Sequence, residues 1–326
     1  MVYLITGGAG FIGSHLCAHL LACGNQVIAV DNLSTGLYRN IAHLKDQPNF
    51  SIFITDVRNH QVLDHLVQQS EVVFHLAAAV GVRLIIDRPV ETLETNILGT
   101  HEVLSLAARY NRKTIITSTS EVYGKSASDC FSEDDDSVLG PSTRKRWSYA
   151  CSKLSDEFLA LALHEEKGLP VIIARLFNTV GARQAGRYGM VVPTFVRQAL
   201  QGEPITVFGT GSQSRCFIHV SEVVDALIKL AQAESALGQV VNLGSNQSIT
   251  IAELAQKVKE ITGSNSEIVT VPYDAAYQKG FEDMERRVPD IRKAYRLIGF
   301  NPQKTIVDII RDVAEEMKRE EEIRLI

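Results

Sequence analysis

The chain has 326 residues, which corresponds to about two domains, and its 45% hydrophobic and 22% charged residues are typical of a folded globular protein. This composition excludes a disordered chain, a fibrous repeat and a disulfide-stapled miniprotein. A net charge of −5, from 33 basic and 38 acidic residues, argues against nucleic-acid binding, which requires a strongly basic surface.

The amino-terminal residues predict neither a targeting segment nor a membrane span. The apolar run at residues 2–5 breaks at the glycines that follow and is too short for either. The five cysteines are odd in number and form no CxxC pair. We therefore expect free thiols in a reducing cytoplasm and no membrane partner.

A glycine-rich segment follows the first expected strand. The sequence TGGAGFIG at residues 6–13 places Gly7, Gly10 and Gly13 three apart, directly before a helical pattern. Gly7 allows a tight turn, Gly10 lets the backbone approach a pyrophosphate, and Gly13 lets the helix pack close to the strand. The segment predicts a dinucleotide site at the N-terminus of the first helix.

An acidic residue stands where the adenosine ribose of such a site would lie. Asp31 ends the second expected strand, eighteen positions after Gly13. Its carboxylate can accept both ribose hydroxyls and would repel a 2′-phosphate, so we expect NAD and not NADP as cofactor. The other expected cofactor contacts are Phe11, Ile12, Asn32, Asp56, Val57, Leu76, Ala77, Ala78 and Asn96.

Short apolar runs alternate with amphipathic stretches through the first half of the chain. Strands are expected at residues 2–6, 26–30, 51–54, 72–76, 114–118 and 171–176, and the clearest helices at 11–23, 90–110 and 149–166. This alternation predicts an α/β fold with a doubly wound parallel sheet. We expect an NAD-binding Rossmann domain at 1–176, with returning segments near 217–250. A smaller substrate lobe should occupy mainly 177–326 and end in a charged helix at 311–324.

A tyrosine and a lysine lie four residues apart on the helix expected at 149–166. Tyr149 and Lys153 therefore share one helix face. An ammonium near a phenol favours the phenolate and lowers its pKa, which suits the phenol as a general base. The lysine can also hold the ribose of the nicotinamide.

These motifs together resemble the extended short-chain dehydrogenase/reductase family, in its nucleotide-sugar-modifying branch. The resemblance covers nearly the whole chain. It includes the glycine segment, HLAA at 75–78, NILGT at 96–100, STSEVYG at 118–124, YACSK at 149–153, RLFNTVG at 175–181 and GSQSRCFIHV at 211–220.

The resemblance implies roles for individual residues. Thr119 matches the family's active-site hydroxyl, Tyr149 its general base and Lys153 the residue that tunes the base. Arg215 matches the arginine that pairs with the nucleotide diphosphate, as a guanidinium fork suits phosphate oxygens. Asn178 and Val192 are further expected substrate contacts. The implied partner is a UDP-sugar, and the family implies a homodimer built from the helices at 90–110 and 149–166.

Enzymes of this branch first oxidise the sugar at C4 with bound NAD and then diverge. A 4-epimerase reduces the ketone from the other face, and a 4,6-dehydratase expels the C6 hydroxyl. A decarboxylase loses carbon dioxide from a uronic acid, since the C4 ketone is β to the C5 carboxylate. The residues Ser120 and Glu121 bear on this choice, because decarboxylases and dehydratases carry an acid where Glu121 stands.

The balance of the resemblance favours a UDP-glucuronate decarboxylase. The segments GP at 140–141, RWSY at 146–149 and RRVPDI at 286–291 resemble decarboxylases, and Arg287 matches an arginine that acts on the substrate carboxylate or on proton transfer. Against this, Arg83 in GVR at 81–83 resembles UDP-glucuronate 4-epimerases. A 4-epimerase of UDP-glucose, UDP-glucuronate or UDP-N-acetylglucosamine and a nucleotide-sugar 4,6-dehydratase remain alternatives. A non-catalytic NAD- or sugar-binding regulator is a remote one.

Two further patterns are interpreted as structural, so we expect no metal site. His15 and His19 are four apart on a helix, a spacing that can ligate zinc, but no third ligand is near. The acidic run at 133–136 lacks the alternating ligands and the glycine of a calcium loop.

Overall fold

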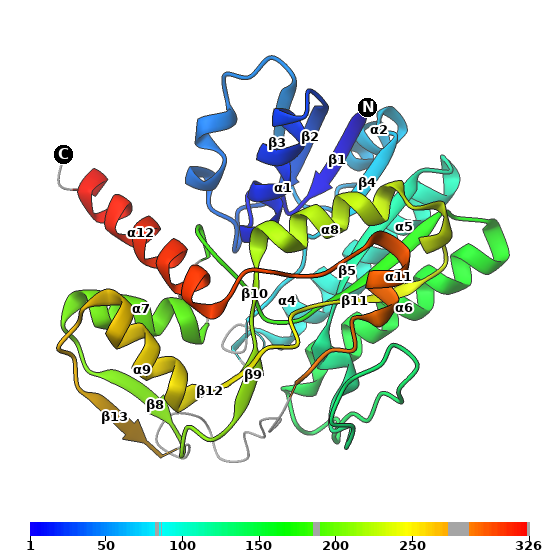
Figure 1. Cartoon of the computed structure of the whole chain (residues 1–326). Helices are drawn as coiled ribbons and strands as arrows, with labels where there is room; N and C mark the ends of the chain where they lie inside the picture. Colours follow the sequence, from blue (N-terminus) through cyan, green and yellow to red (C-terminus); the bar gives the residue numbers. More distant parts are fainter. Residues whose placement is uncertain (82–84, 86, 185–189, 273–286, 325–326) are drawn as a thin grey trace.

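A seven-stranded, all-parallel sheet forms the centre of the computed structural model, which describes residues 1–81, 85, 87–184, 190–272 and 287–324 (Figure 1). The strand order is β11-β6-β5-β4-β1-β2-β3. The strands are β1 (Val2–Thr6), β2 (Gln26–Asp31), β3 (Phe50–Ile54), β4 (Val72–His75), β5 (Lys113–Thr119), β6 (Val171–Leu176) and β11 (Val240–Leu243). The chain starts in the middle, builds outward through β2 and β3, and then returns past β1 to β4. The predicted doubly wound sheet is confirmed.

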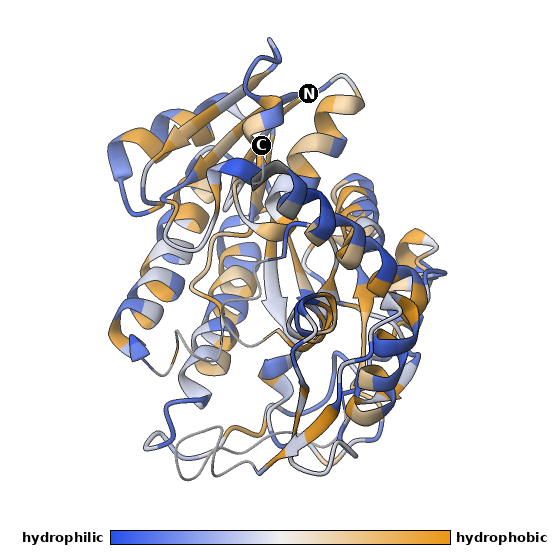
Figure 2. Ribbon diagram, turned by 90° about the vertical axis from the view of Figure 1, so that its left-hand side faces the viewer, coloured by the Kyte–Doolittle hydropathy of each residue, from blue (hydrophilic) through white to orange (hydrophobic). Residues whose placement is uncertain are grey.

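Helices cover both faces of this sheet because its strands are apolar on both sides. On one face, Ile5 packs in a cluster with Leu16 of α1 (Phe11–Ala22) and Leu227 of α8 (Val220–Gln232). On the other face, Leu4 packs with residues of α2 (His60–Gln69) and α5 (Gly99–Arg109). The helix α6 (Trp147–Lys167) lies beside α5 over β5 and β6. In Figure 2 the helices carry both hydrophobic and hydrophilic colours, as expected of elements with one buried side.

The segment expected to form one helix at 90–110 is helical but contains an irregular turn. It consists of α4 (Pro89–Leu93), a π-helical turn η3 (Glu94–Leu98) and α5. The buried Asn96 lies in this π turn and accepts a hydrogen bond from Ala79 N at 2.8 Å. Its amide donates to Ser152 Oγ of α6 at 3.1 Å. The wider turn thus brings a polar side chain inward to join β4, α5 and α6, a use typical of π turns.

A smaller lobe with its own apolar core packs at the carboxyl edge of the sheet (Figure 1). It contains α7 (Val191–Gln201), β8 (Ile205–Phe208), α9 (Ile251–Thr262), β13 (Ile268–Val271) and α12 (Ile306–Arg324). Two small pairs join the regions: β7 (Thr179–Val180) with β10 (Ile218–His219), and β9 (Ser214–Cys216) with β12 (Ser248–Thr250). The remaining elements are η1 (Tyr38–Asn40), η2 (Ala42–Leu44), η4 (Ser120–Tyr123), η6 (Glu234–Ala236) and α11 (Arg292–Ile298).

The last helix is tied to the segment that leaves the sheet. Asp312 Oδ2 on α12 accepts hydrogen bonds from Ala182 N at 2.8 Å and lies 3.2 Å from His219 Nε2. His15 Nε2 lies 2.9 Å from the Ala182 carbonyl oxygen, so this histidine has a backbone partner. In the described part of the chain, no three metal-ligating side chains gather. None of the described helices has the length and apolar character to cross a membrane.

Candidate active site

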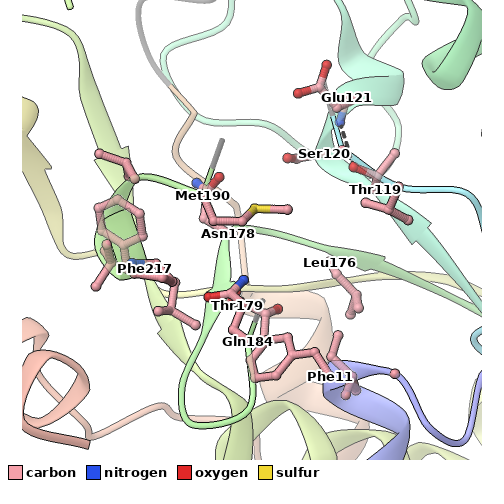
Figure 3. Close-up of a pocket in the computed structure, with 18 of the residues that line it drawn as sticks. Phe11, Thr119, Ser120, Glu121, Leu176, Asn178, Thr179, Gln184, Met190 and Phe217 are labelled. Atoms are coloured by element: carbon pink, nitrogen blue, oxygen red, sulfur yellow. Dashed lines mark hydrogen bonds between the residues drawn. The ribbon is translucent and has the colours of Figure 1, made fainter. Parts of the chain in front are cut away.

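A cavity of about 710 Å³ lies between the carboxyl edge of the sheet and the lobe. Its size is that of ordinary small-ligand sites. The residues predicted from the sequence that line it are Gly7, Gly10, Phe11, Ile12, Gly13, Leu76, Ala78, Thr119, Ser120, Glu121, Tyr149, Lys153, Asn178, Val192, Arg215 and Arg287. In Figure 3, Phe11 and the turn carrying Thr119 to Glu121 come from separate elements and face the same space. The structure therefore brings most of the predicted residues to one site.

Six predicted residues lie outside the lining of this cavity. They are Asp31, Asn32, Asp56, Val57, Ala77 and Asn96. Asp56 is engaged with its neighbours: it accepts from Arg58 Nε at 2.8 Å and from Asn32 Nδ2 at 3.0 Å, and the Arg58 hydrogen bonds lower its pKa to about 2. Arg83 lies outside the described residues.

The glycine segment forms a tight turn that excludes side chains. Gly7 has φ +73°, and a Cβ there would lie 2.8 Å from Ala77 N. A Cβ on Gly13 would lie 2.1 Å from the Gly7 carbonyl oxygen. Helix α1 then begins at Phe11 with no capping side chain, and its first residues, Phe11, Ile12 and Gly13, line the cavity. Uncapped amides at a helix N-terminus suit an anionic group such as a pyrophosphate.

Asp31 is enclosed by the loop that follows β2. It is buried, and its carboxylate accepts from Ala9 N at 3.0 Å and from Leu33 N at 2.8 Å. Burial raises the pKa of Asp31, while these backbone hydrogen bonds oppose the rise. A Cβ on Gly36 would lie 2.7 Å from Asp31 Oδ1, so the loop needs glycine to close over the carboxylate.

The end of β5 carries the residues expected to do chemistry. Thr119 is the last residue of the strand, and its Oγ1 accepts a hydrogen bond from Glu121 N at 3.2 Å (Figure 3). Tyr149, on the first turn of α6, hydrogen-bonds to the Thr119 side chain. The two hydroxyls that the resemblance predicts for proton transfer are thus in contact.

Glu121 is held by two arginines from distant parts of the chain. Its Oε1 lies 2.5 Å from Arg287 Nη1 and its Oε2 lies 3.3 Å from Arg146 Nη2. Burial alone would raise the pKa of Glu121, but the charges of Arg287 and Arg146 bring it below its ordinary value. The carboxylate is therefore ionised, next to two cations, at the wall of the cavity.

The pKa of Tyr149 differs from the expectation drawn from the sequence. Lys153 was expected to lower it, but burial, first, and the Glu121 carboxylate, second, raise it. Asp156 adds a smaller rise. This carboxylate also pairs with the lysine, since Lys153 Nζ donates to Asp156 Oδ2 at 2.8 Å and both side chains are buried.

A buried polar network holds the turn that carries Thr119 and Glu121. Ser118 Oγ donates to Glu157, and Arg175 Nη2 donates to Glu157 Oε2 at 2.7 Å. The Arg175 guanidinium lies 4.7 Å from the ring centroid of Tyr123, whose hydroxyl donates to Asn242 Oδ1 at 2.7 Å. Since Ser118 and Tyr123 flank the turn, the network fixes both of its ends.

Sequence analysis gave no role to two arginines that line the cavity. Arg146 belongs to the decarboxylase-like segment at 146–149, but only its ion pair with Glu121 reveals a role. Arg183 has φ +66° and donates from Nη1 to the Ser14 carbonyl oxygen at 3.3 Å, which sets it beside the start of α1. It lies in a loop without a recognisable motif, so no pattern in the sequence signals it.

His75, in the HLAA motif, gives a pH prediction. It is buried between Thr6 Oγ1, 2.7 Å from Nδ1, and Thr100 Oγ1, 3.0 Å from Nε2. Burial, with a smaller effect of Lys153, lowers its pKa to about 3. Between the unfolded value near 6.5 and this folded value, only the unfolded state binds the proton, so the free energy of unfolding should fall by ~1 kcal/mol per pH unit as the pH drops. Urea unfolding at pH 7.0, 6.0 and 5.5 measures this.

The matched variant for this prediction is His75→Asn, which removes the titrating group. Its free energy of unfolding should depend less on pH than that of the wild type over the same range. Equal pH slopes in the two proteins would contradict the assignment of His75 as a neutral buried residue.

Known proteins resemble this chain over most of its length. The sequence profile of the GDP-mannose 4,6 dehydratase family matches residues 4–313. The chain is 43% identical over 300 residues to UDP-N-acetyl-alpha-D-glucosaminuronate decarboxylase of Bacillus cytotoxicus, with 92% of each chain covered. It is 39% identical over 299 residues to UDP-glucuronic acid decarboxylase 1 of Danio rerio, which covers 92% of this chain and 68% of that protein.

A solved structure with the same fold contains both ligand classes expected for the cavity. UDP-glucuronic acid 4-epimerase from Bacillus cereus, in complex with UDP-glucuronic acid and NAD, superposes with a TM-score of 0.87 at 28% identity. The match covers 98% of this chain and 100% of that one.

Proposed function

The chain belongs to the GDP-mannose 4,6-dehydratase family of extended short-chain dehydrogenases/reductases, and from this premise we propose that it decarboxylates a UDP-linked uronic acid with NAD as cofactor. The observation that carries the proposal is the ionised Glu121, paired with Arg287 and Arg146 in the same cavity as Thr119 and Tyr149. A plain 4-epimerase has no step that uses such a carboxylate. The relatives named as uronate decarboxylases support the same reaction.

The residues at the glycine turn fit a dinucleotide. A Cβ on Gly7 or Gly13 would collide with backbone, and the uncapped amides of α1 offer donors to a pyrophosphate. Asp31 is proposed to take the adenosine ribose and Lys153 the other ribose. When bound, NAD supplies the oxidation of a carbinol and the later return of the electrons.

The chain's own groups then handle protons and charge. Tyr149, with Thr119 in contact, takes the proton of the sugar's C4 hydroxyl during oxidation. The resulting ketone is β to the C5 carboxylate. The C5–C6 bond breaks, its electron pair moves toward the C4 oxygen, and carbon dioxide leaves. The C4 carbonyl then re-forms as C5 takes a proton from solvent. The negative charge of the substrate thus moves from its C5 carboxylate, on the side of Glu121, to its C4 oxygen, beside the hydroxyls of Thr119 and Tyr149.

The nucleotide end of the substrate is proposed to lie toward the lobe. Arg215 lines the cavity there and is offered to the diphosphate, with Asn178 and Val192 as further contacts. On this proposal residues 1–176, with the returning segment near 217–250, bind NAD, and residues 177–326 mainly bind the UDP-sugar.

Proton NMR of separate reactions tests the function. The protein is incubated with UDP-glucuronate, UDP-N-acetylglucosaminuronate, UDP-glucose and UDP-N-acetylglucosamine. A pentose or 4-keto-pentose product from a uronate supports decarboxylation. A galacto-configured product without loss of carbon dioxide would replace it with 4-epimerisation, and a 4-keto-6-deoxy product with dehydration. Denatured protein should release NAD and not NADP.

We also propose a homodimer through α4, η3 and α6. These elements expose apolar side chains on their outer faces: Val90 is 66%, Leu98 53% and Phe158 67% exposed. On α6, Phe158 shares its exposed face with the small residues Ser155 and Ala162, which allow a close helix approach.

The dimer gives a mass prediction. Phe158→Asp places a charge in the apolar face and should shift the protein from dimer to monomer at micromolar concentration, as measured by light scattering. Tyr295→Asp, at an aromatic residue of α11 that is 61% exposed, is the matched control and should leave the mass unchanged. A wild-type monomer would contradict the proposal.

A further inference from the structure

A buried acid lies directly against the lysine of the catalytic pair. Asp156 is 2% exposed and lies one helical turn beyond Lys153 on α6. Its Oδ2 accepts from Lys153 Nζ at 2.8 Å, and the lysine is equally buried. A carboxylate out of water is costly unless it is paired and hydrogen-bonded, so this pair is a built feature of the site.

A chain of hydrogen bonds leads from the glycine turn to Asp156. Ala77 N donates to Thr6 Oγ1 at 3.3 Å, and Thr6 Oγ1 lies 2.7 Å from His75 Nδ1. His75 Nε2 lies 3.0 Å from Thr100 Oγ1, and Thr100 hydrogen-bonds to Asp156.

One direction of these bonds satisfies every member. The Thr6 hydroxyl donates to His75 Nδ1, so the ring proton is assigned to Nε2 and donates to Thr100. The Thr100 hydroxyl then donates to Asp156, which also accepts from Lys153. The chain of donors therefore ends on the Asp156 carboxylate, which is consistent with an ionised acid and a neutral imidazole.

Few other charges act on this pair. Among the described residues, the ionisable groups that face it are Tyr149 and Glu157 from α6 itself and His75 from β4. Glu157 is bound by Arg175, and His75 is neutral. From the η4 turn, Glu121 acts on Tyr149 but is paired with its own arginines. Asp156 is itself among the groups that raise the pKa of Tyr149, after burial and Glu121.

We propose that Asp156 is a positioning residue that fixes the Lys153 ammonium one helical turn from Tyr149 and offsets its charge. This rests on the proposed roles of Tyr149 and Lys153 as base and partner. Its consequence is that the phenol keeps its proton at neutral pH in the ligand-free protein. Removing the carboxylate leaves the ammonium uncompensated, and the pKa of Tyr149 should fall by about one unit or more.

Direct titration of the phenol tests the proposal. Wild type and Asp156→Asn are labelled with ¹³Cζ-tyrosine and loaded with NAD, and the Tyr149 resonance is assigned with Tyr149→Phe. The Asp156→Asn midpoint is expected at least about one pH unit below that of the wild type. In Asp156→Glu, which keeps the charge, the midpoint should return most of the way to the wild-type value. Glu165→Gln, an exposed acid on the same helix, controls for net charge and should not move the midpoint.

An unchanged or higher midpoint in Asp156→Asn overturns the proposal, whatever the loss in rate, because a purely structural residue would lower activity without moving the titration. Asp156→Ser removes the same charge and is judged by the same criterion. Failure of both variants to fold and retain NAD would also overturn it, since the residue would then serve stability. The titration needs no sugar, so it remains decisive if decarboxylation is disproved. With an active substrate, the acidic limb of kcat should move in the same direction.

Discussion

Tyr149→Phe is expected to lower the rate of carbon dioxide release from the UDP-linked uronic acid by about 10²–10⁴-fold, the usual contribution of a positioned acid or base. The variant keeps the buried ring and removes only the hydroxyl that contacts Thr119. Without it the C4 hydroxyl loses the main acceptor for its proton, so the opening oxidation slows. The rate is measured by NMR and the bound NAD by analysis of the denatured protein.

The control for this variant is Tyr110→Phe, which removes one surface hydroxyl bonded to Asp64 at 3.0 Å. It should keep wild-type activity. Retention of NAD in Tyr149→Phe separates lost chemistry from a lost cofactor. A Tyr149→Phe rate within a few fold of wild type would show that another group takes the proton.

Glu121→Gln is expected to lower both kcat and KM for a UDP-uronate. In the wild type, Glu121 occupies Arg287 and Arg146, so a substrate carboxylate must compete with it for these cations. A neutral amide binds the two arginines more weakly than a carboxylate does. The arginines therefore bind the substrate carboxylate more tightly. Stabilising the ground state of a group that must leave as neutral carbon dioxide slows its departure, so kcat should fall by about 10²-fold or more.

Two measurements distinguish this explanation from general damage to the site. The affinity for a UDP-pentose, which has no carboxylate, should be unchanged in Glu121→Gln while that for the UDP-uronate rises. Glu133→Gln, at an acid that accepts from Asn242 N at 2.8 Å, is the control for a lost carboxylate nearby. A raised KM for the uronate in Glu121→Gln would contradict the competition between carboxylates.

The sheet was predictable because its strands are short, β-branched and apolar on both faces. Those features are local, so the six runs identify themselves without tertiary information. β11 was not expected as a strand, since Val240–Leu243 gains its place only by pairing with β6. The π turn at Glu94–Leu98 also escapes a periodicity of 3.6 residues, because one extra residue per turn is set by the inward bonds of Asn96.

The parts of the site formed by a local sequence motif were predictable. The ion pairs between residues far apart in the sequence were not. The glycine turn needs only its own spacing. The ion pair between Glu121 and Arg287 joins residues 166 apart, and only resemblance to a family indicated Arg287. Lys153 and Asp156 are three apart, a spacing usually found in surface pairs, so the sequence alone did not indicate a buried counter-charge for the lysine.

The repeated crossing between sheet and lobe has a consequence for how long ligands stay. The chain passes from one to the other after β6, returns through β10 to α8, and crosses again after β11, while Asp312 fastens α12 to the loop at Ala182. Spreading the two apart would bend several connections at once, so wide opening is costly and exchange of an enclosed nucleotide should be slow. In the proposed reaction the cofactor takes up electrons in the first step and gives them back in the last. Long residence favours such a reaction, because a cofactor that dissociated in between would leave the sugar oxidised.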